Sequence, residues 1–583
     1  MPQLLISHES LVDHSFVKAC VEPWRGALRS LAICVLLAMP FFVQSIHAKE
    51  AAIASPEPNA TEVGLAVLRR GGNAVDAAVA VAFTLAVTLP EAGNIGGGGF
   101  MTLYVDETPA FLDYRETAPA AAFRDMYLDE AGVVDPNASV TGHRAVGVPG
   151  TVAGLWAAHS RYGVLPWKSL VEPAISLAQS GFVVEQGFLD EVDFERERLS
   201  GKTNFFDYFG GAEAGERFVQ PELARTLRRI AEIGATEFYS GQTARMIVAQ
   251  MRSGGGLITP ADLESYEPRW REPLTLQWRG YEIVTAPLPS SGGLAILQYL
   301  QMKERLAEAF AGLPHNSPQF IHLKSEIEKR IFADRASFLG DADFVPVPLD
   351  TLLDHDRLMQ RADEVRINGI SPTEPATSLR EPTHTTHFSI LDTKGNAVSN
   401  TYTLNTSFGS GVVVKGAGFL LNNEMDDFSA APNQPNYYGV VGDEANAIAP
   451  GKRMLSSMAP TILLRGDDVA MALGAMGGST IFTTVYQTIS NIIEFGMSPE
   501  QAQAVTRVHH QLLPKDLITY SPTPPLASQT IEALKDRGYR VEPHFFEYGN
   551  VQLIWRDEEG VLSAVSDPRF NGVSAVINIP GDR

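Results

Sequence analysis

The stretch at residues 385–404 reads TTHFSILDTKGNAVSNTYTL, and its pattern is the most informative part of the chain for predicting the fold. Two adjacent threonines open it, and two runs of alternating polar and apolar residues follow. The runs are joined by DTKGN at 392–396, a composition typical of a tight turn. Alternation with a period of two on either side of a turn predicts a β-hairpin that begins at the threonine pair.

The turn decides which residues of the hairpin face each other. A loop centred on Lys394 sets Thr385 opposite Thr403, whereas a two-residue loop shifts the partner by one position and makes Thr403 a diagonal neighbour. Asn405 shares a strand face with Thr403, because side chains alternate along a strand. In either register Thr385, Thr403 and Asn405 gather on or near one patch.

Threonine is a weak nucleophile unless a base takes its proton. When a threonine is the first residue of a chain, its own α-amine titrates at about 7.7–8.0 and can serve as that base. This requires cleavage before Thr385, which the same hydroxyl can bring about by attacking the preceding carbonyl. Residues 341–383 are rich in Pro, Asp and Thr and predict an exposed connector before the pair. From spacing alone, ordinary strand threonines are the commoner alternative.

The composition narrows the class of protein. The 583 residues are 45% hydrophobic and 20% charged, enough apolar material for a large core and unlike a disordered chain. The formal net charge of -22 argues against nucleic acid and anionic membrane surfaces as partners.

The N-terminus has the pattern of a secretory signal. Residues 31–43, LAICVLLAMPFFV, form an apolar run that follows two arginines and precedes a small residue, Ala48. This order predicts a signal peptide over 1–48 and an exported protein, periplasmic or extracellular. An uncleaved anchor is the alternative, but the run is short for a membrane span and contains Pro40.

Cysteine usage agrees with removal of this segment. The only two cysteines, Cys20 and Cys34, both lie within it. A mature chain from Lys49 therefore has no disulfide, no thiolate metal ligand and no cysteine nucleophile. No later run reaches about 18 apolar residues, so no other membrane span is expected.

The remaining sequence mixes helices and strands. Helices are expected at 73–89, across much of 150–340 and at 479–496, and strands at 101–105, at 109–114 and from 383 onward. This mixture is typical of an α/β or α+β fold.

A series of motifs resembles the γ-glutamyltransferase (glutathione hydrolase) family. In chain order they are GGNAVDAAVA, GNIGGGGFM, LDYRETAP, GVPGTVAGL, PLPSSGG, the hairpin segment through SFGSG, LLNNEMDDFS, RMLSSMAPTI, GAMGGS and SDPR. The resemblance implies an N-terminal nucleophile hydrolase, an α+β fold with a four-layer αββα sandwich built jointly by two subunits of one precursor. It also implies cleavage between His384 and Thr385, giving a large subunit 49–384, a small subunit 385–583 and a heterodimer of the two.

The resemblance implies two groups of donor-binding residues. Arg115 would hold the α-carboxylate of a γ-glutamyl donor, as a guanidinium can do bidentately, with hydroxyls from Ser456 and Ser457. The α-ammonium would be held by Asn405, Glu424 and Asp427. Taken alone, the EMDD run could be a solvated acidic loop. If its acids are buried, a glutaryl donor without the amine would leave them unpaired.

Further residues are implied for catalysis. Gly477 and Gly478 precede a helix expected to start at Ser479, where backbone N–H groups can stabilise an oxyanion. Thr403 would orient Thr385, and Tyr438 would lie on a lid loop at 432–443 that limits acceptor size and excludes water.

Two other chemistries are not supported. Glycines 96–99 are not followed by Gly-Lys-Ser/Thr, so a phosphate-binding loop is rejected. His509 and His510 are adjacent and have no spaced partner ligands, so no metal is expected, and no cofactor is implied.

The sequence therefore predicts an exported γ-glutamyl hydrolase/transferase for glutathione and similar γ-glutamyl amides. Its partners would be small-molecule donors, amino-acid or peptide acceptors and water, without nucleic acid. The alternatives are a cephalosporin (glutaryl) acylase on the same fold and a non-processing amino-acid-binding protein.

Overall fold

The computed structural model describes residues 49–372, 385–432 and 434–580. The expected signal segment 1–48 with both cysteines, and the bond after His384, lie outside the described residues. The fold described here is that of the compact unit Lys49–Ile579.

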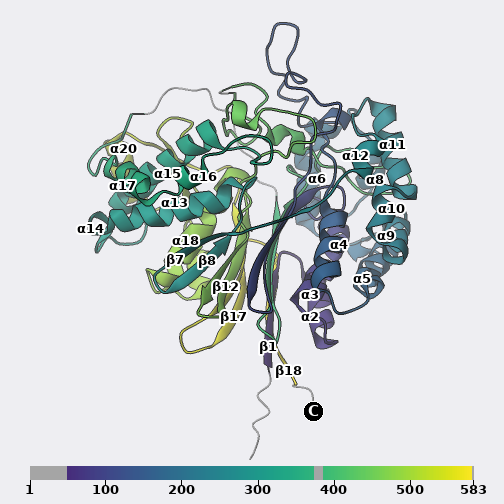
Figure 1. Cartoon of the computed structure of the whole chain (residues 1–583), viewed down its shortest axis with the longest axis horizontal. Helices are drawn as coiled ribbons and strands as arrows, with labels where there is room; N and C mark the ends of the chain where they lie inside the picture. The colour runs from purple at the N-terminus through teal and green to yellow at the C-terminus, as the bar shows by residue number, and fades with distance from the viewer. Residues whose placement is uncertain (1–48, 373–384, 433, 581–583) are drawn as a thin grey trace, which may run out of the picture. The chain divides into compact units, whose positions relative to one another are not determined.

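Two antiparallel sheets form the centre of this unit (Figure 1). The seven-stranded sheet has the order β18 (Val573–Ile579), β1 (Lys49–Ser55), β9 (Thr386–Leu391), β10 (Ala397–Thr403), β2 (Gly98–Val105), β3 (Thr108–Tyr114) and β6 (Arg269–Arg271). The six-stranded sheet has the order β17 (Leu562–Ser566), β16 (Gly549–Arg556), β12 (Asp468–Met476), β11 (Thr461–Arg465), β8 (Tyr281–Thr285) and β7 (Leu274–Trp278). Both sheets combine strands from before and after residue 385.

Helices cover the outer face of each sheet, which completes the expected αββα sandwich (Figure 1). The helices on the seven-stranded sheet and the layer behind them are α2 (Pro58–Arg69), α3 (Ala74–Thr88), α4 (Thr151–Tyr162), α5 (Trp167–Ser180), α9 (Pro221–Ile233), α10 (Ala235–Tyr239), α11 (Gln242–Gly254) and α12 (Pro260–Glu264). Those on the six-stranded side are α13 (Ser291–Arg305), α15 (Pro318–Phe338), α16 (Leu349–Leu352), α17 (His355–Asp363) and α18 (Ile481–Ile493).

Shorter elements complete the described chain. They are α6 (Gln186–Phe194), α7 (Arg196–Leu199), α8 (Phe205–Phe209), α14 (Ala307–Phe310), α19 (Pro499–Ala504), α20 (Ser528–Arg537), β4 (Phe182–Val183), β5 (Arg217–Phe218), β13 (Val508–His509), β14 (Leu517–Tyr520) and β15 (Arg540–Pro543). Across the described ranges, no helix is long and apolar enough to cross a membrane.

The predicted hairpin is β9 and β10, and its register is the one centred on Lys394. Tyr402 lies opposite Thr386 and Ala397 opposite Leu391. Every residue of both strands is buried, because the apolar face packs on α3 and the polar face meets the second sheet. Hydroxyl groups on this polar face form hydrogen bonds with the second sheet. Ser399 Oγ, for example, donates to the Leu473 carbonyl at 2.8 Å.

The buried helix expected at 73–89 is α3, and its start follows from a capping box. The Asn73 side chain accepts from the Asp76 N–H, and the Asp76 carboxylate accepts from the Asn73 N–H. One expectation was wrong: part of the proposed connector 341–383 is folded. Residues 349–352 and 355–363 are helical and bury Leu352 and Leu358. Residues 373–384 lie outside the described residues.

Candidate active site

Thr385, the predicted nucleophile, directly precedes the first residue of β9. Thr386 pairs with Tyr402, so the next step of the register sets Thr385 opposite Thr403. Both side chains are buried, with 5% and 4% of their surface exposed. The chain turns sharply just after Thr403, since Asn405 has a φ of 83° and its N–H donates to Thr403 Oγ1 at 2.8 Å.

A pocket of about 340 Å³ of space, part of it open to solvent, adjoins Thr385. Its lining contains nine of the eleven residues expected at the site: Thr385, Thr403, Arg115, Asn405, Asp427, Tyr438, Ser456, Ser457 and Gly478. The other two adjoin lining residues: Glu424 forms an ion pair with Arg115, and Gly477 directly precedes Gly478. Segments far apart in sequence thus meet around one threonine.

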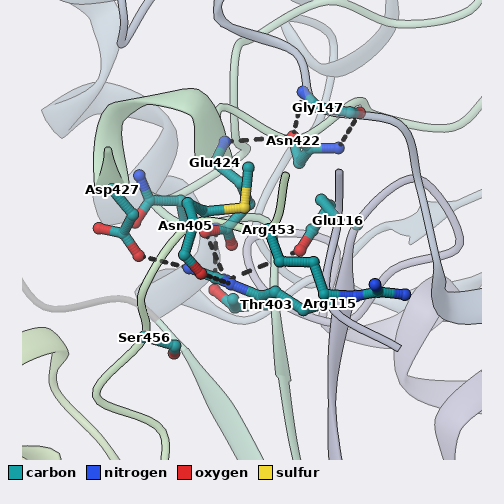
Figure 2. A network of polar contacts seen from close by, with 12 residues as sticks. Arg115, Glu116, Gly147, Thr403, Asn405, Asn422, Glu424, Asp427, Arg453 and Ser456 are labelled. Carbon is teal, nitrogen blue, oxygen red and sulfur yellow. Dashed lines mark hydrogen bonds and ion pairs between the residues drawn. The ribbon is translucent and has the colours of Figure 1, made fainter. Parts of the chain in front are cut away.

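Arg115 is the centre of a buried ionic cluster that Figure 2 shows. It follows the last residue of β3, and its backbone N–H donates to Asp113 Oδ1 at 2.9 Å. Its Nη1 lies 2.6 Å from Glu424 Oε2, and its Nη2 lies 2.5 Å from Asp427 Oδ2. Glu116 is a third carboxylate, 3.6 Å from Nη1. These partners raise the pKa of Arg115 against the opposing effect of burial.

Burial disfavours the ionised form of the carboxylates in this cluster, and the charge of Arg115 favours it. Burial raises the pKa of Glu116 to about 8 and the pKa of Glu424 well above its ordinary value, and Arg115 opposes both shifts. Burial also raises the pKa of Asp427. Asp426 belongs to a different environment, since its oxygens accept from Ser139 Oγ and the Tyr437 N–H.

Hydrogen bonds join the pair Ser456 and Ser457 to the segment at the start of α13. Ser456 donates its N–H to the Pro289 carbonyl at 2.9 Å, and its own carbonyl accepts from both the N–H and the hydroxyl of Ser291. The Ser456 hydroxyl oxygen accepts from the Met458 N–H at 3.1 Å, which leaves its hydrogen available as a donor. Ser457 lines the same wall of the pocket.

Two glycines follow β12 of the second sheet, and the second of them, Gly478, lines the pocket. Gly477 and Gly478 have φ values of 130° and 54°, a region that favours glycine. The helix does not begin at Ser479 as expected: Gly478–Thr480 form a 3₁₀ turn, and α18 starts at Ile481. A Cβ at position 478 would come within 2.4 Å of the Tyr438 ring.

Tyr438 covers the pocket from the 432–443 loop. Its hydroxyl donates to the Asn405 carbonyl at 2.5 Å, and its ring rests on Gly478. Its side chain is only 5% exposed. The loop is tied down further by Asn436, whose Nδ2 donates to Asp427 Oδ1 at 3.0 Å.

Sequence reasoning missed several pocket residues. Arg335, Asn436 and Ser479 also line the pocket. Asn436 and Ser479 lie within segments already under consideration. Arg335 lies in a helix whose sequence carries no local signal for a site, and only tertiary packing brings it here.

Thr385 also lines a second and larger cavity, about 1810 Å³ including its open mouth. Thr386 and Met476 share this wall. The charged residues of the lining are mostly acidic: Glu57, Glu91, Glu185, Glu191, Arg217 and Arg569. Burial raises the pKa of Glu91 to about 8. Within the described ranges, no group of three or more His, Cys, Asp or Glu side chains could hold a metal ion.

Comparison with known proteins gives consistent results. The family model described as Gamma-glutamyltranspeptidase matches residues 60–577. The chain is 56% identical over 526 residues to a Glutathione hydrolase proenzyme of Pseudomonas aeruginosa, covering 90% of this chain and 94% of that protein. It is 42% identical over 534 residues to the protein of the same name from Escherichia coli K12, covering 90% and 91%.

Solved structures resemble the fold closely. A cephalosporin acylase from Bacillus halodurans aligns with a TM-score of 0.79 at 29% identity, covering 91% of this chain and 96% of that chain. A gamma-glutamyltranspeptidase from Pseudomonas nitroreducens, complexed with L-DON, aligns with a TM-score of 0.54 at 55% identity. That match covers 55% of this chain and 95% of that chain.

Proposed function

The chain belongs to the gamma-glutamyltranspeptidase family, and on that premise we propose that it is a precursor that cuts itself before Thr385 and then uses Thr385 as its nucleophile. The mature protein is a γ-glutamyl hydrolase and transferase whose donors are glutathione and other γ-glutamyl amides. The observation that carries this proposal is the position of Thr385, opposite Thr403 and at the wall of a pocket with Arg115 and Asp427.

The two subunits would be 49–384 and 385–583, after removal of a signal peptide at 1–48 and export. The interleaving of strands supports a permanent heterodimer, because each sheet would lose members if either segment left. The coverage of a solved relative is consistent with this, since 95% of that chain corresponds to only 55% of the present one.

The proposed reaction begins at the free α-amine of Thr385. The amine takes the proton of Thr385 Oγ while the oxygen attacks the γ-carbonyl, and N–H groups of Gly477 and Gly478 stabilise the oxyanion. The amine then gives this proton to the departing amine as the C–N bond breaks. A γ-glutamyl ester remains, and water or an acceptor amine resolves it by the same proton transfers in reverse.

Donor recognition would use the charges of the pocket. Arg115, Ser456 and Ser457 would take the α-carboxylate, while Asn405, Glu424 and Asp427 would take the α-ammonium. Glu424 is fully buried, and 14% of the Asp427 side chain is exposed. A glutaryl donor would place no cation against them, which is costly for buried carboxylates. This favours glutamyl donors over the glutaryl substrates of an acylase with the same fold.

Acceptor access would come from the second cavity, because it reaches Thr385 from outside the donor pocket. Four glutamates and two arginines line it, a balance that suits an amine-bearing acceptor. Exchange of Glu191 for Gln should lower transfer to a lysine-containing dipeptide more than transfer to glycylglycine. Equal effects on both acceptors would argue against this cavity as the acceptor site.

Two measurements test the proposed function. Intact mass analysis of the purified protein should give two chains that begin near residue 49 and at Thr385. The two-chain protein should release p-nitroaniline from a γ-glutamyl anilide with a much higher kcat/KM than from a glutaryl anilide. A chain that stays whole, or a preference for glutaryl, would refute the assignment.

A further inference from the structure

Arg335 is a buried cation in the wall of the donor pocket that has no carboxylate partner among the described residues. It lies in α15, it is 7% exposed and it lines the pocket with Ser456. Its Nε donates to Ser291 Oγ at 3.2 Å. No carboxylate within the described ranges lies within the 4.0 Å ion-pair distance of its guanidinium. Burial lowers the pKa of Arg335 to about 10, and only the more distant charge of Asp427 opposes this.

Other buried arginines of the same protein are paired. Arg330, five residues earlier in α15 and 6% exposed, has Glu326 Oε2 at 3.2 Å. Arg507 has Asp567 Oδ2 at 2.5 Å. Because a buried charge without a partner is costly, an unpaired guanidinium at a pocket wall indicates a site for an anion. A guanidinium suits a carboxylate, which it can bind through two parallel hydrogen bonds.

The neighbours of Arg335 indicate which carboxylate it would meet. Ser291 connects Arg335 to Ser456, since the same hydroxyl that accepts from Arg335 donates to the Ser456 carbonyl at 2.8 Å. Arg335 therefore lies at the serine end of the pocket, where the donor α-carboxylate is proposed to bind. Arg115, in contrast, already faces Glu424 and Asp427 at 2.6 and 2.5 Å.

We propose that Arg335 is a further substrate-binding residue, which receives the α-carboxylate of the γ-glutamyl donor together with Ser456. Arg335 would supply a positive charge that no carboxylate of the described residues neutralises, whereas the charge of Arg115 is already paired with Glu424 and Asp427. Arg115 would bind the same carboxylate and would also hold Glu424 and Asp427 in place for the α-ammonium. This inference rests on the proposed function, because it concerns the donor of that reaction.

Three anilide donors test the two charges of the substrate one at a time. The γ-glutamyl anilide has both the α-carboxylate and the α-ammonium, the 4-aminobutyryl anilide lacks the carboxylate, and the glutaryl anilide lacks the ammonium. With Arg335→Met, we expect kcat/KM for the γ-glutamyl and glutaryl donors to fall at least tenfold. For the 4-aminobutyryl donor it should change less than twofold. Arg335→Lys should lie between wild type and Arg335→Met on the first two donors.

Arg330→Met is the matched control, because it removes an equally buried arginine of the same helix that does not line the pocket. It should lower all three values by one common factor, if at all. An equal loss on all three donors for Arg335→Met, or no loss, would overturn the proposal. Should Arg335→Met fail to fold, the donor pattern of Arg335→Lys decides the question. Failure of wild type to hydrolyse any γ-glutamyl donor would instead refute the proposed function.

Discussion

Nη2 of Arg115 donates to Oδ2 of Asp427 at 2.5 Å, so the two residues expected to bind opposite ends of the donor bind each other directly. A zwitterionic donor carries the complementary pair of charges and can match each member of this ion pair. A donor with one charge missing cannot do so. Breaking a buried pair from one side leaves an uncompensated charge, which makes single substitutions here informative.

Arg115→Lys should mainly weaken donor binding. The lysine ammonium is a point charge, and it would replace a planar guanidinium that contacts Glu424 and Asp427 through two different nitrogens. We expect a loss of about 1.5–3 kcal/mol in transition-state binding, the range for hydrogen bonds to charged groups, measured as kcat/KM. Arg124→Lys is the control, because Arg124 is part of a more exposed pair with Glu444. Unchanged kinetics at low substrate would remove Arg115 from the site.

Asp427→Asn should relax discrimination against glutaryl donors. The amide can still accept from Asn436, but it no longer offers a negative charge to the α-ammonium. The ratio of kcat/KM for γ-glutamyl over glutaryl anilide should fall. Asp426→Asn should leave the ratio alone, since Asp426 contacts Ser139 and Tyr437 outside the pocket lining. An unaltered ratio in Asp427→Asn would mean that this carboxylate does not meet the ammonium.

Binding of L-glutamate should release a proton near neutral pH. Burial raises the pKa of Glu116 to about 8 and raises the pKa values of Glu424 and Asp427. The cluster therefore retains protons at pH 7 that an arriving ammonium group displaces, because a cation favours the ionised carboxylates. Affinity should consequently increase as pH rises from 6 to 8. Calorimetry at pH 7 in buffers with different ionisation enthalpies measures the release, and heats that do not depend on the buffer would exclude it.

Local sequence signals predicted part of this architecture well. Alternation around DTKGN predicted the hairpin and gave the observed register at Lys394 as one of two possibilities, and the apolar run at 73–89 predicted α3. These features depend on contacts between near neighbours, so a short window contains them. The grouping of Arg115 with Glu424 depends on packing between distant segments, and it was expected only through the family resemblance.

The errors have physical reasons as well. Residues 349–363 are rich in Asp and directly follow Pro348, which is typical of a connector, but Leu352 and Leu358 pack against apolar residues in the layer of α13 and become buried. Arg335 was missed because a charged residue in a helix normally faces solvent. Its burial arises from the way α15 packs behind the serine loop, which no local pattern records.

The last prediction concerns the two threonines at the start of the hairpin. Thr385→Ala lacks the hydroxyl, so it should remain a single chain on a denaturing gel and should not hydrolyse donors. Thr385→Ser keeps a hydroxyl and should still cut itself and retain some turnover. Thr386→Val is the control: the Thr386 hydroxyl is buried and has no hydrogen-bond partner among the described residues, so an isosteric apolar side chain should be tolerated.

N-terminal sequencing of the smaller wild-type fragment should read Thr-Thr-His-Phe-Ser. A fragment that starts at Thr386 would show that the adjacent threonine is the nucleophile, although its side chain belongs to β9 rather than to the donor pocket. Normal cleavage in Thr385→Ala would mean that another group cuts the chain. Loss of cleavage and of turnover from one substitution, with both retained in Thr386→Val, is the result that the geometry at Thr385 and Thr403 requires.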